Sequence, residues 1–199
     1  MSQNKTNFAV PLAFVGMMFF AIGFALGINS FLIPVLKGAL SLPSGVAYLL
    51  LAATFVPFLI FGYPASATIA KIGYKRTMAL SFLIFAVAFI LFVLSAKLEN
   101  FILFLIASFV SGAANAYLQA SVNPYITILG PIESAAKRMS IMGICNKLAW
   151  PVAPLFFALV VADQTNVQTS DLYLPFYIII GVFLLLGIIS LMAPLPEVK

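Results

Sequence analysis

The chain has 199 residues, of which 64% are hydrophobic and only 8% are charged, whereas an ordinary soluble domain has about 25% charged residues. This composition predicts a membrane protein. In such a protein basic loop residues set the membrane orientation, which accounts for the net charge of +5, so we expect no nucleic-acid partner. The absence of histidine, the single cysteine and the scattered carboxylates exclude a Ser-His-Asp triad, an intramolecular disulfide and a metal cluster, so we expect neither an enzyme nor a cofactor.

Six apolar runs are long enough to cross the hydrocarbon core of a bilayer, which takes roughly 20 helical residues. In chain order they cover residues 8–36, 46–70, 77–95, 101–129, 139–162 and 173–193. The first run is too long for the apolar core of a signal peptide, so we expect it to remain in the protein. The sequence therefore predicts an all-α membrane protein, with residues 1–199 forming one bundle of six transmembrane helices.

The first and fourth runs resemble each other, because GFALGINSFLIP and GAANAYLQASVNP both place an asparagine near a proline toward the end of the span. This similarity divides the chain into two three-helix units, residues 8–96 and 97–193. Inverted three-plus-three repeats with discontinuous helices at a midplane site are typical of transporters. The third and sixth runs are almost uniformly apolar, so we expect them at the periphery, with the first, fourth and fifth lining the interior.

The basic residues predict the orientation of the bundle. One side of the membrane receives Lys5, Lys71, Lys75, Arg76, Lys137, Arg138 and Lys199, and the other side receives only Lys37 and Lys97. Since cytoplasmic loops are enriched in Lys and Arg, both chain termini are predicted to be cytoplasmic. Lys147 belongs to neither side, because it lies within the fifth run.

A stripe of small and polar residues follows one face of the fourth run, at spacings of four, three, four and four: Ser108, Gly112, Asn115, Gln119 and Asn123. The fifth run adds Asn146, Lys147 and Trp150, and the first run adds Asn29 and Ser30. Amides that both donate and accept hydrogen bonds, next to an aromatic ring, suit a neutral solute rich in hydroxyl groups. We therefore predict that these eight amide, hydroxyl, lysine and tryptophan side chains, without Ser108 and Gly112, bind substrate.

The small and polar residues of these spans also have structural interpretations. Gly23 and Gly27 are typical of close helix packing, and amides also bond across helices. Trp150 is either a platform for a sugar ring or part of the packed core. Lys147 either extends toward the membrane surface or reaches a polar cavity, and no acid of this chain lies within a span to pair with it.

The segments NPYITILGPIESAAKR and MGICNKLAWPVAP, together with NSFLIP and the loop AKIGYKR, resemble the fucose, glucose and galactose cation symporters of the major facilitator superfamily. These segments are most similar to those of glucose/galactose transporters of the Bacteroidetes type. The resemblance covers essentially the whole chain and implies a bacterial inner-membrane sugar transporter. Such proteins have twelve spans in two bundles, so the chain resembles the N-terminal half, and residues 194–199 resemble the start of the central cytoplasmic linker.

This resemblance implies transport of a hexose by alternating access against a partner, either a C-terminal six-helix half or a second copy of the chain. The loop with Lys71, Gly73, Lys75 and Arg76 would serve as a gate latch and topology anchor. Two departures concern coupling: Ser30 stands where fucose/proton symporters carry Asp, and Gln119 where they carry Glu. Coupling to H+ or to Na+, coupling through the other half and facilitated diffusion all stay open, as do a membrane-embedded sugar sensor and a passive pore.

Overall fold

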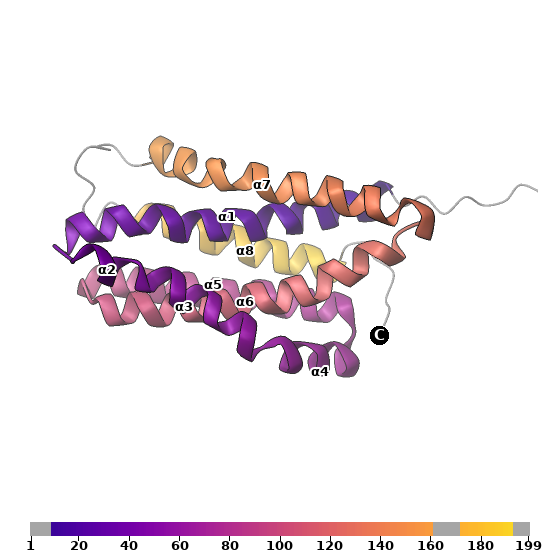
Figure 1. The fold of residues 1–199 in the computed structure, drawn as a ribbon, viewed down its shortest axis with the longest axis horizontal. Helices are drawn as coiled ribbons and strands as arrows, with labels where there is room; N and C mark the ends of the chain where they lie inside the picture. Colours follow the sequence, from indigo (N-terminus) through magenta and orange to yellow (C-terminus); the bar gives the residue numbers. More distant parts are fainter. Residues whose placement is uncertain (1–8, 161–171, 193–199) are drawn as a thin grey trace, which may run out of the picture.

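A bundle of long helices makes up the computed structural model, which describes residues 9–160 and 172–192 (Figure 1). Five helices are long and apolar enough to cross a membrane by themselves: α1 (Ala9–Ala39), α5 (Tyr74–Leu98), α6 (Phe101–Ile128), α7 (Ala135–Val160) and α8 (Tyr173–Met192). In Figure 1, α7, α1, α6 and α3 lie side by side, with α8 and α5 behind them. Lys5, Lys199 and the predicted linker 194–199 lie outside the described residues.

The second predicted span is a broken helix. It consists of α2 (Ser44–Ala47), α3 (Leu49–Ile60) and α4 (Gly62–Ile72), and the chain bends by 54° between α3 and α4 (Figure 1). Pro64 has no N–H to donate to the carbonyl of Ile60, and its ring crowds that carbonyl, so a regular helix cannot continue through this turn. With the bent pair counted as one span, the bundle has the six predicted spans.

The break does not lie in either of the two spans that resemble each other in the sequence. α1 and α6 run unbroken for 31 and 28 residues although they contain Pro34 and Pro124. The break lies instead at Phe61, whose N–H donates to Pro57 O at 2.8 Å and whose carbonyl accepts from Ala65 N at 2.9 Å. The helix assignment is therefore interrupted beside Pro64 but continues through Pro34 and Pro124, which the sequence pattern does not reveal.

The two residues between α5 and α6 cap both helices. Glu99 takes a left-handed conformation, with φ of 49°, and ends α5. The side-chain oxygen of Asn100 accepts hydrogen bonds from Ile102 N at 2.9 Å and from Leu103 N at 3.4 Å, which satisfies the first free N–H groups of α6. This tight connection makes α5 and α6 antiparallel neighbours.

Aromatic side chains fill the core between α5, α7 and α8. The buried rings of Phe85 and Phe183 stack with centroids 4.8 Å apart, and those of Phe92 and Phe176 lie 5.5 Å apart. In lipid, helices associate through such packing rather than through hydrophobic burial. α5, the third predicted span, buries one face in this packing and exposes side chains such as Leu83 on the other, whereas α8 leaves most of its surface exposed. The peripheral position of these two spans stays a prediction.

Candidate functional site

α1 and α7 approach each other closely at two glycines. A Cβ atom added at Gly23 would lie 2.0 Å from the carbonyl oxygen of Asn146, and one added at Gly27 would lie 2.8 Å from the carbonyl oxygen of Trp150. No larger residue fits at Gly23 without separating the helices, so the packing interpretation of the two glycines is confirmed. These contacts also fix the turn of α7 that carries Asn146, Lys147 and Trp150.

The same kind of contact joins α6 to α3. A Cβ atom at Gly112 would lie 2.0 Å from the carbonyl oxygen of Thr54 and 3.0 Å from Cγ of Pro57. Gly112 belongs to the polar stripe of α6, so its contact turns that stripe toward α3. The two glycine contacts, α1 on α7 and α6 on α3, pair the first helix of each predicted three-helix unit with the second helix of the other.

A buried hydrogen bond joins the polar stripe to α1. The hydroxyl of Ser108 donates to Oδ1 of Asn29 at 3.3 Å, and Nδ2 of Asn29 donates to the carbonyl of Ala25 at 3.3 Å. Both side chains are buried. Asn29 therefore contributes to the contact between two helices, and the stripe of α6 follows the seam where α1 and α3 meet.

Asn115 is fully buried in this stripe, and neither of its side-chain polar atoms has a hydrogen-bond partner among the described residues. The hydroxyl of Ser111, one turn earlier and also fully buried, lacks a partner as well. A buried polar group without a partner costs about 1–3 kcal/mol. Groups left in this condition in a folded protein need an explanation, and a bound polar molecule supplies one.

The stripe becomes more accessible toward the end of α6. Asn115 is buried, whereas Gln119 and Asn123, one and two turns further on the same face, are half-buried. The five residues of the stripe thus form a graded surface, with its packed end at Ser108 and its accessible end at Asn123. A solute that bonds Gln119 and Asn123 lies on the same helix face as the unpartnered amide of Asn115.

On α7, Lys147 is exposed and its Nζ lies 5.9 Å from the centroid of the Trp150 ring. A cation over an aromatic face is stabilised by about 0.5–1 kcal/mol at exposed sites. The indole Nε1 of Trp150 is buried without an acceptor, which adds an unpartnered donor to this helix. Asn146 is half-buried, with its backbone against Gly23.

The structure does not bring all the predicted residues into contact. Across residues 9–160 and 172–192, no hydrogen bond joins an amide of α6 to Asn146 or Lys147, since α1 packs against both helices and separates them. Ser30 points elsewhere: its hydroxyl donates to Leu26 O at 3.3 Å, and it lines a separate cavity of about 500 Å³ with Pro34, Lys37 and Tyr48. The candidate site is therefore two polar surfaces on either side of α1.

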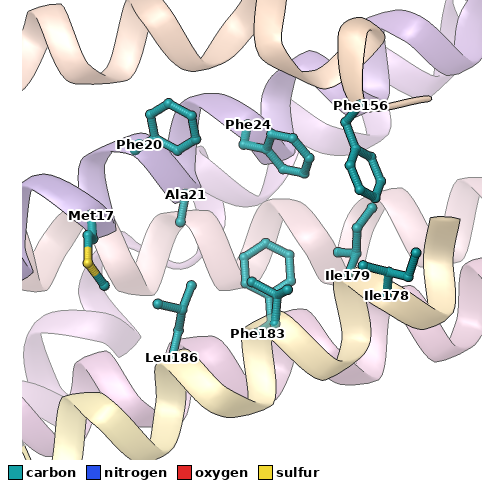
Figure 2. A pocket seen from close by; sticks show the side chains of 10 residues that line it. Met17, Phe20, Ala21, Phe24, Phe156, Ile178, Ile179, Phe183 and Leu186 are labelled. Atoms are coloured by element: carbon teal, nitrogen blue, oxygen red, sulfur yellow. The ribbon is translucent and has the colours of Figure 1, made fainter. Parts of the chain in front are cut away.

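A second cavity, of about 290 Å³, lies between α1, α7 and α8. Figure 2 shows that Phe20, Phe24, Phe156 and Phe183 point into it, and all ten lining side chains contain only carbon, hydrogen and sulfur. A hydroxyl-rich solute would lose its hydrogen bonds to water in such a cavity without replacing them. This cleft is therefore not part of the candidate site.

The predicted gate loop is a tight turn between α4 and α5. Gly73 ends α4 with φ of 88°, and its carbonyl accepts hydrogen bonds from the backbone N–H of Thr77 at 3.2 Å and from the Thr77 hydroxyl at 2.7 Å. The positive φ explains why glycine stands here. Lys71 and Arg76 are exposed and Lys75 is half-buried.

Comparison with known proteins assigns this arrangement of helices. The Major Facilitator Superfamily profile matches residues 14–199. The chain belongs to the Major Facilitator Superfamily. A glucose/galactose transporter of Brucella abortus is 30% identical over the whole chain, and the L-fucose-proton symporter of Escherichia coli is 23% identical over 98% of it. A putative glucose/galactose transporter of Helicobacter pylori is 28% identical over 99% of the chain.

Solved structures of the superfamily share the fold. The E. coli fucose:proton symporter matches 95% of the chain with a TM-score of 0.77 at 23% identity, and a superfamily transporter in the outward conformation, FucP, matches with a TM-score of 0.79. The chain covers 50% of both structures and 49% of the Brucella transporter. This superfamily chain thus has the fold of the N-terminal half, and it spans about half the length of these relatives.

Arg138 stabilises the end of α6, a role that the sequence did not reveal. Its guanidinium is buried at the end of α6 and donates to the carbonyls of Ile126 at 3.1 Å, Thr127 at 3.0 Å and Pro131 at 2.8 Å, and to the hydroxyl of Ser134. It therefore caps α6 and holds the connection to α7. The sequence pattern showed only a basic residue in a loop, because the bonded carbonyls belong to the backbone.

Proposed function

We propose that this chain is the N-terminal half of a secondary sugar transporter. It moves a hexose across the bacterial inner membrane by alternating access, with a second six-helix bundle closing against it. That partner is a C-terminal half or a second copy of the chain, and the chain termini are cytoplasmic. No covalent chemistry takes part.

The unpartnered polar atoms of Asn115 carry this proposal. A fully buried amide gains free energy as soon as a hydroxyl-bearing molecule reaches it, since a sugar hydroxyl both donates and accepts. Gln119 and Asn123 extend the same face toward the accessible end of the stripe. We assign these three amides to the sugar hydroxyls, because no other surface of the described chain combines accessible amides with unpartnered ones.

α7 supplies the second part of the site. It is the least buried of the five long helices, which leaves Lys147 and the Trp150 ring available to a substrate or to the opposing bundle. We propose that Trp150 covers the apolar face of a sugar ring and that Asn146 and Lys147 complete the polar wall. Asn29 and Ser30 contribute less, since Asn29 bonds Ser108 and Ser30 faces another cavity.

We propose that no side chain of this half carries the coupling proton. Ser30 and Gln119 occupy the positions of the two acids that the family resemblance implies, and neither side chain titrates. Transport is then coupled through the second bundle, driven by Na+, or not coupled at all. The basic turn with Lys71, Gly73, Lys75 and Arg76 acts as a latch between conformations.

Uptake of labelled hexoses into proteoliposomes, with imposed proton or sodium gradients, tests the proposal. We expect Lys147→Met to insert normally and to lower uptake tenfold or more, equivalent to about 1.4 kcal/mol. Lys97→Met is the matched control, because Lys97 also lies over aromatic rings, 5.8 Å from Tyr173 and 5.7 Å from Tyr177, but at the far end of α5. It should leave uptake within twofold of the unmodified protein.

Other outcomes separate the rival functions. Saturable sugar binding without uptake, in the protein with any segment that follows residue 199 retained, would favour a sensor. Uptake that never exceeds the external concentration under either gradient would favour facilitated diffusion or a pore. Equal uptake by the Lys147→Met and Lys97→Met variants would show that Lys147 does not take part in substrate binding.

A further inference from the structure

A groove of about 450 Å³ lies between α5 and α8, the two helices that Figure 1 shows behind α1 and α6. Its walls are apolar: Leu80 and Leu83 come from α5, and Leu184, Ile188 and Leu191 come from α8. Most of these side chains are exposed, with 53% of Leu83 and 56% of Ile188 accessible. Both helices are long and apolar enough to cross a membrane, so the exposed apolar walls suit contact with hydrocarbon.

Small residues form the floor of this groove. A Cβ atom at Gly187 would lie 3.4 Å from Cβ of Phe82 and 3.6 Å from the carbonyl oxygen of Ala79, so the two helices are in near contact there. The larger side chains on either side stand above this contact. The result is an apolar channel lined from Arg76 to Leu83 on α5 and from Leu184 to Leu191 on α8.

One end of the groove carries a positive charge. Arg76 lines it and is exposed, and Lys75 and Lys71 belong to the same α4–α5 turn. Within the described part of the chain the acidic residues are Glu99, at the opposite end of α5, and Glu133, on the connection between α6 and α7, and neither pairs with Arg76. The Arg76 side chain is exposed, so an anion from outside the bundle can reach it.

We propose that this groove binds one anionic phospholipid, with an acyl chain between α5 and α8 and the phosphate at Arg76. The two parts of the groove require an amphiphile: the apolar channel rejects a free anion, and the guanidinium distinguishes an anionic headgroup from a zwitterionic one. Basic residues near a membrane surface attract anionic lipids by about 1 kcal/mol each, which corresponds to about fivefold in relative affinity. The lipid fixes α8, the most weakly buried helix of this pair, against α5.

Tryptophan quenching by brominated lipids tests this site. Leu184 lines the groove, whereas its neighbour Leu185 does not, although both are exposed leucines at nearly the same depth. Leu184→Trp and Leu185→Trp variants, each with Trp150→Phe, are reconstituted as full-length protein into phosphatidylcholine vesicles that contain brominated phosphatidylglycerol or brominated phosphatidylcholine. We expect phosphatidylglycerol to be preferred about fivefold at position 184 and not at position 185.

Variants of Arg76 complete the test. Arg76→Gln should abolish the preference at position 184, and Arg76→Lys should retain most of it, because a lysine keeps the charge near the phosphate. Equal quenching by the two lipids at position 184, or an unchanged preference in Arg76→Gln, would overturn the proposal. Equal preference at positions 184 and 185 would show a general attraction to the anionic surface, which also overturns it. The readout does not depend on sugar uptake, so it stands apart from the proposed function.

Discussion

The contact between α6 and α3 predicts a large effect of replacing Gly112 by alanine. The added Cβ would lie 2.0 Å from the carbonyl oxygen of Thr54, whereas ordinary contacts of this kind lie at 3.4–4 Å, so the two backbones must separate by about 1.4 Å. Because the obstacle is backbone, no rotamer change relieves it. Overpacking of this kind costs about 1–3 kcal/mol, and the backbone clash places Gly112→Ala near the upper value. Alanine recovers roughly 1 kcal/mol over glycine within a helix, so we expect the free energy of unfolding to fall by about 2 kcal/mol.

Reversible unfolding in mixed detergent and denaturant measures this loss, with Gly181→Ala as the control. Gly181 lies in α8, and a Cβ there meets nothing within 4 Å, so its replacement should be neutral or slightly stabilising. Gly112→Ala should also reduce sugar uptake, because Asn115 lies one turn away on the displaced helix. If the two variants unfold within about 0.5 kcal/mol of each other, the close approach of α6 and α3 does not exist.

Three further predictions concern single side chains. Arg138→Ala should destabilise the protein by about 3 kcal/mol in the same unfolding assay, with Arg138→Lys recovering only part, because the guanidinium bonds three carbonyls at the end of α6; a neutral Arg138→Ala would refute the capping role. Asn115→Leu should stabilise the fold by about 1 kcal/mol, since it removes unpartnered buried groups, yet lower uptake at least tenfold; loss of stability would mean that the amide is already bonded. Gln119→Glu should make uptake depend on pH, and full activity at every pH would place this side chain away from the substrate.

The number of spans could be predicted from the sequence, and their ends to within about four residues. Crossing hydrocarbon requires a long apolar helix whatever its neighbours are, so the runs at 101–129 and 173–193 coincide with α6 and α8 to within a residue. Packing at Gly23 and Gly27 was predictable for the same local reason, because small residues spaced by four permit close approach. The family resemblance of the segments around Asn123 and Asn146 added the fold, which the comparisons confirm.

The arrangement of the polar residues depended on the tertiary structure. Asn115, Gln119 and Asn123 share one face in the sequence pattern, but only the contacts with α1 and α3 determine that the first is sealed and the other two are half-buried. The helix breaks beside Pro64 but continues through Pro34 and Pro124, and the role of Arg138 becomes visible only with its carbonyl partners. Hydropathy is a property of each residue against its solvent and can be read along the chain, whereas burial and hydrogen bonding depend on how helices far apart in the sequence are rotated against each other.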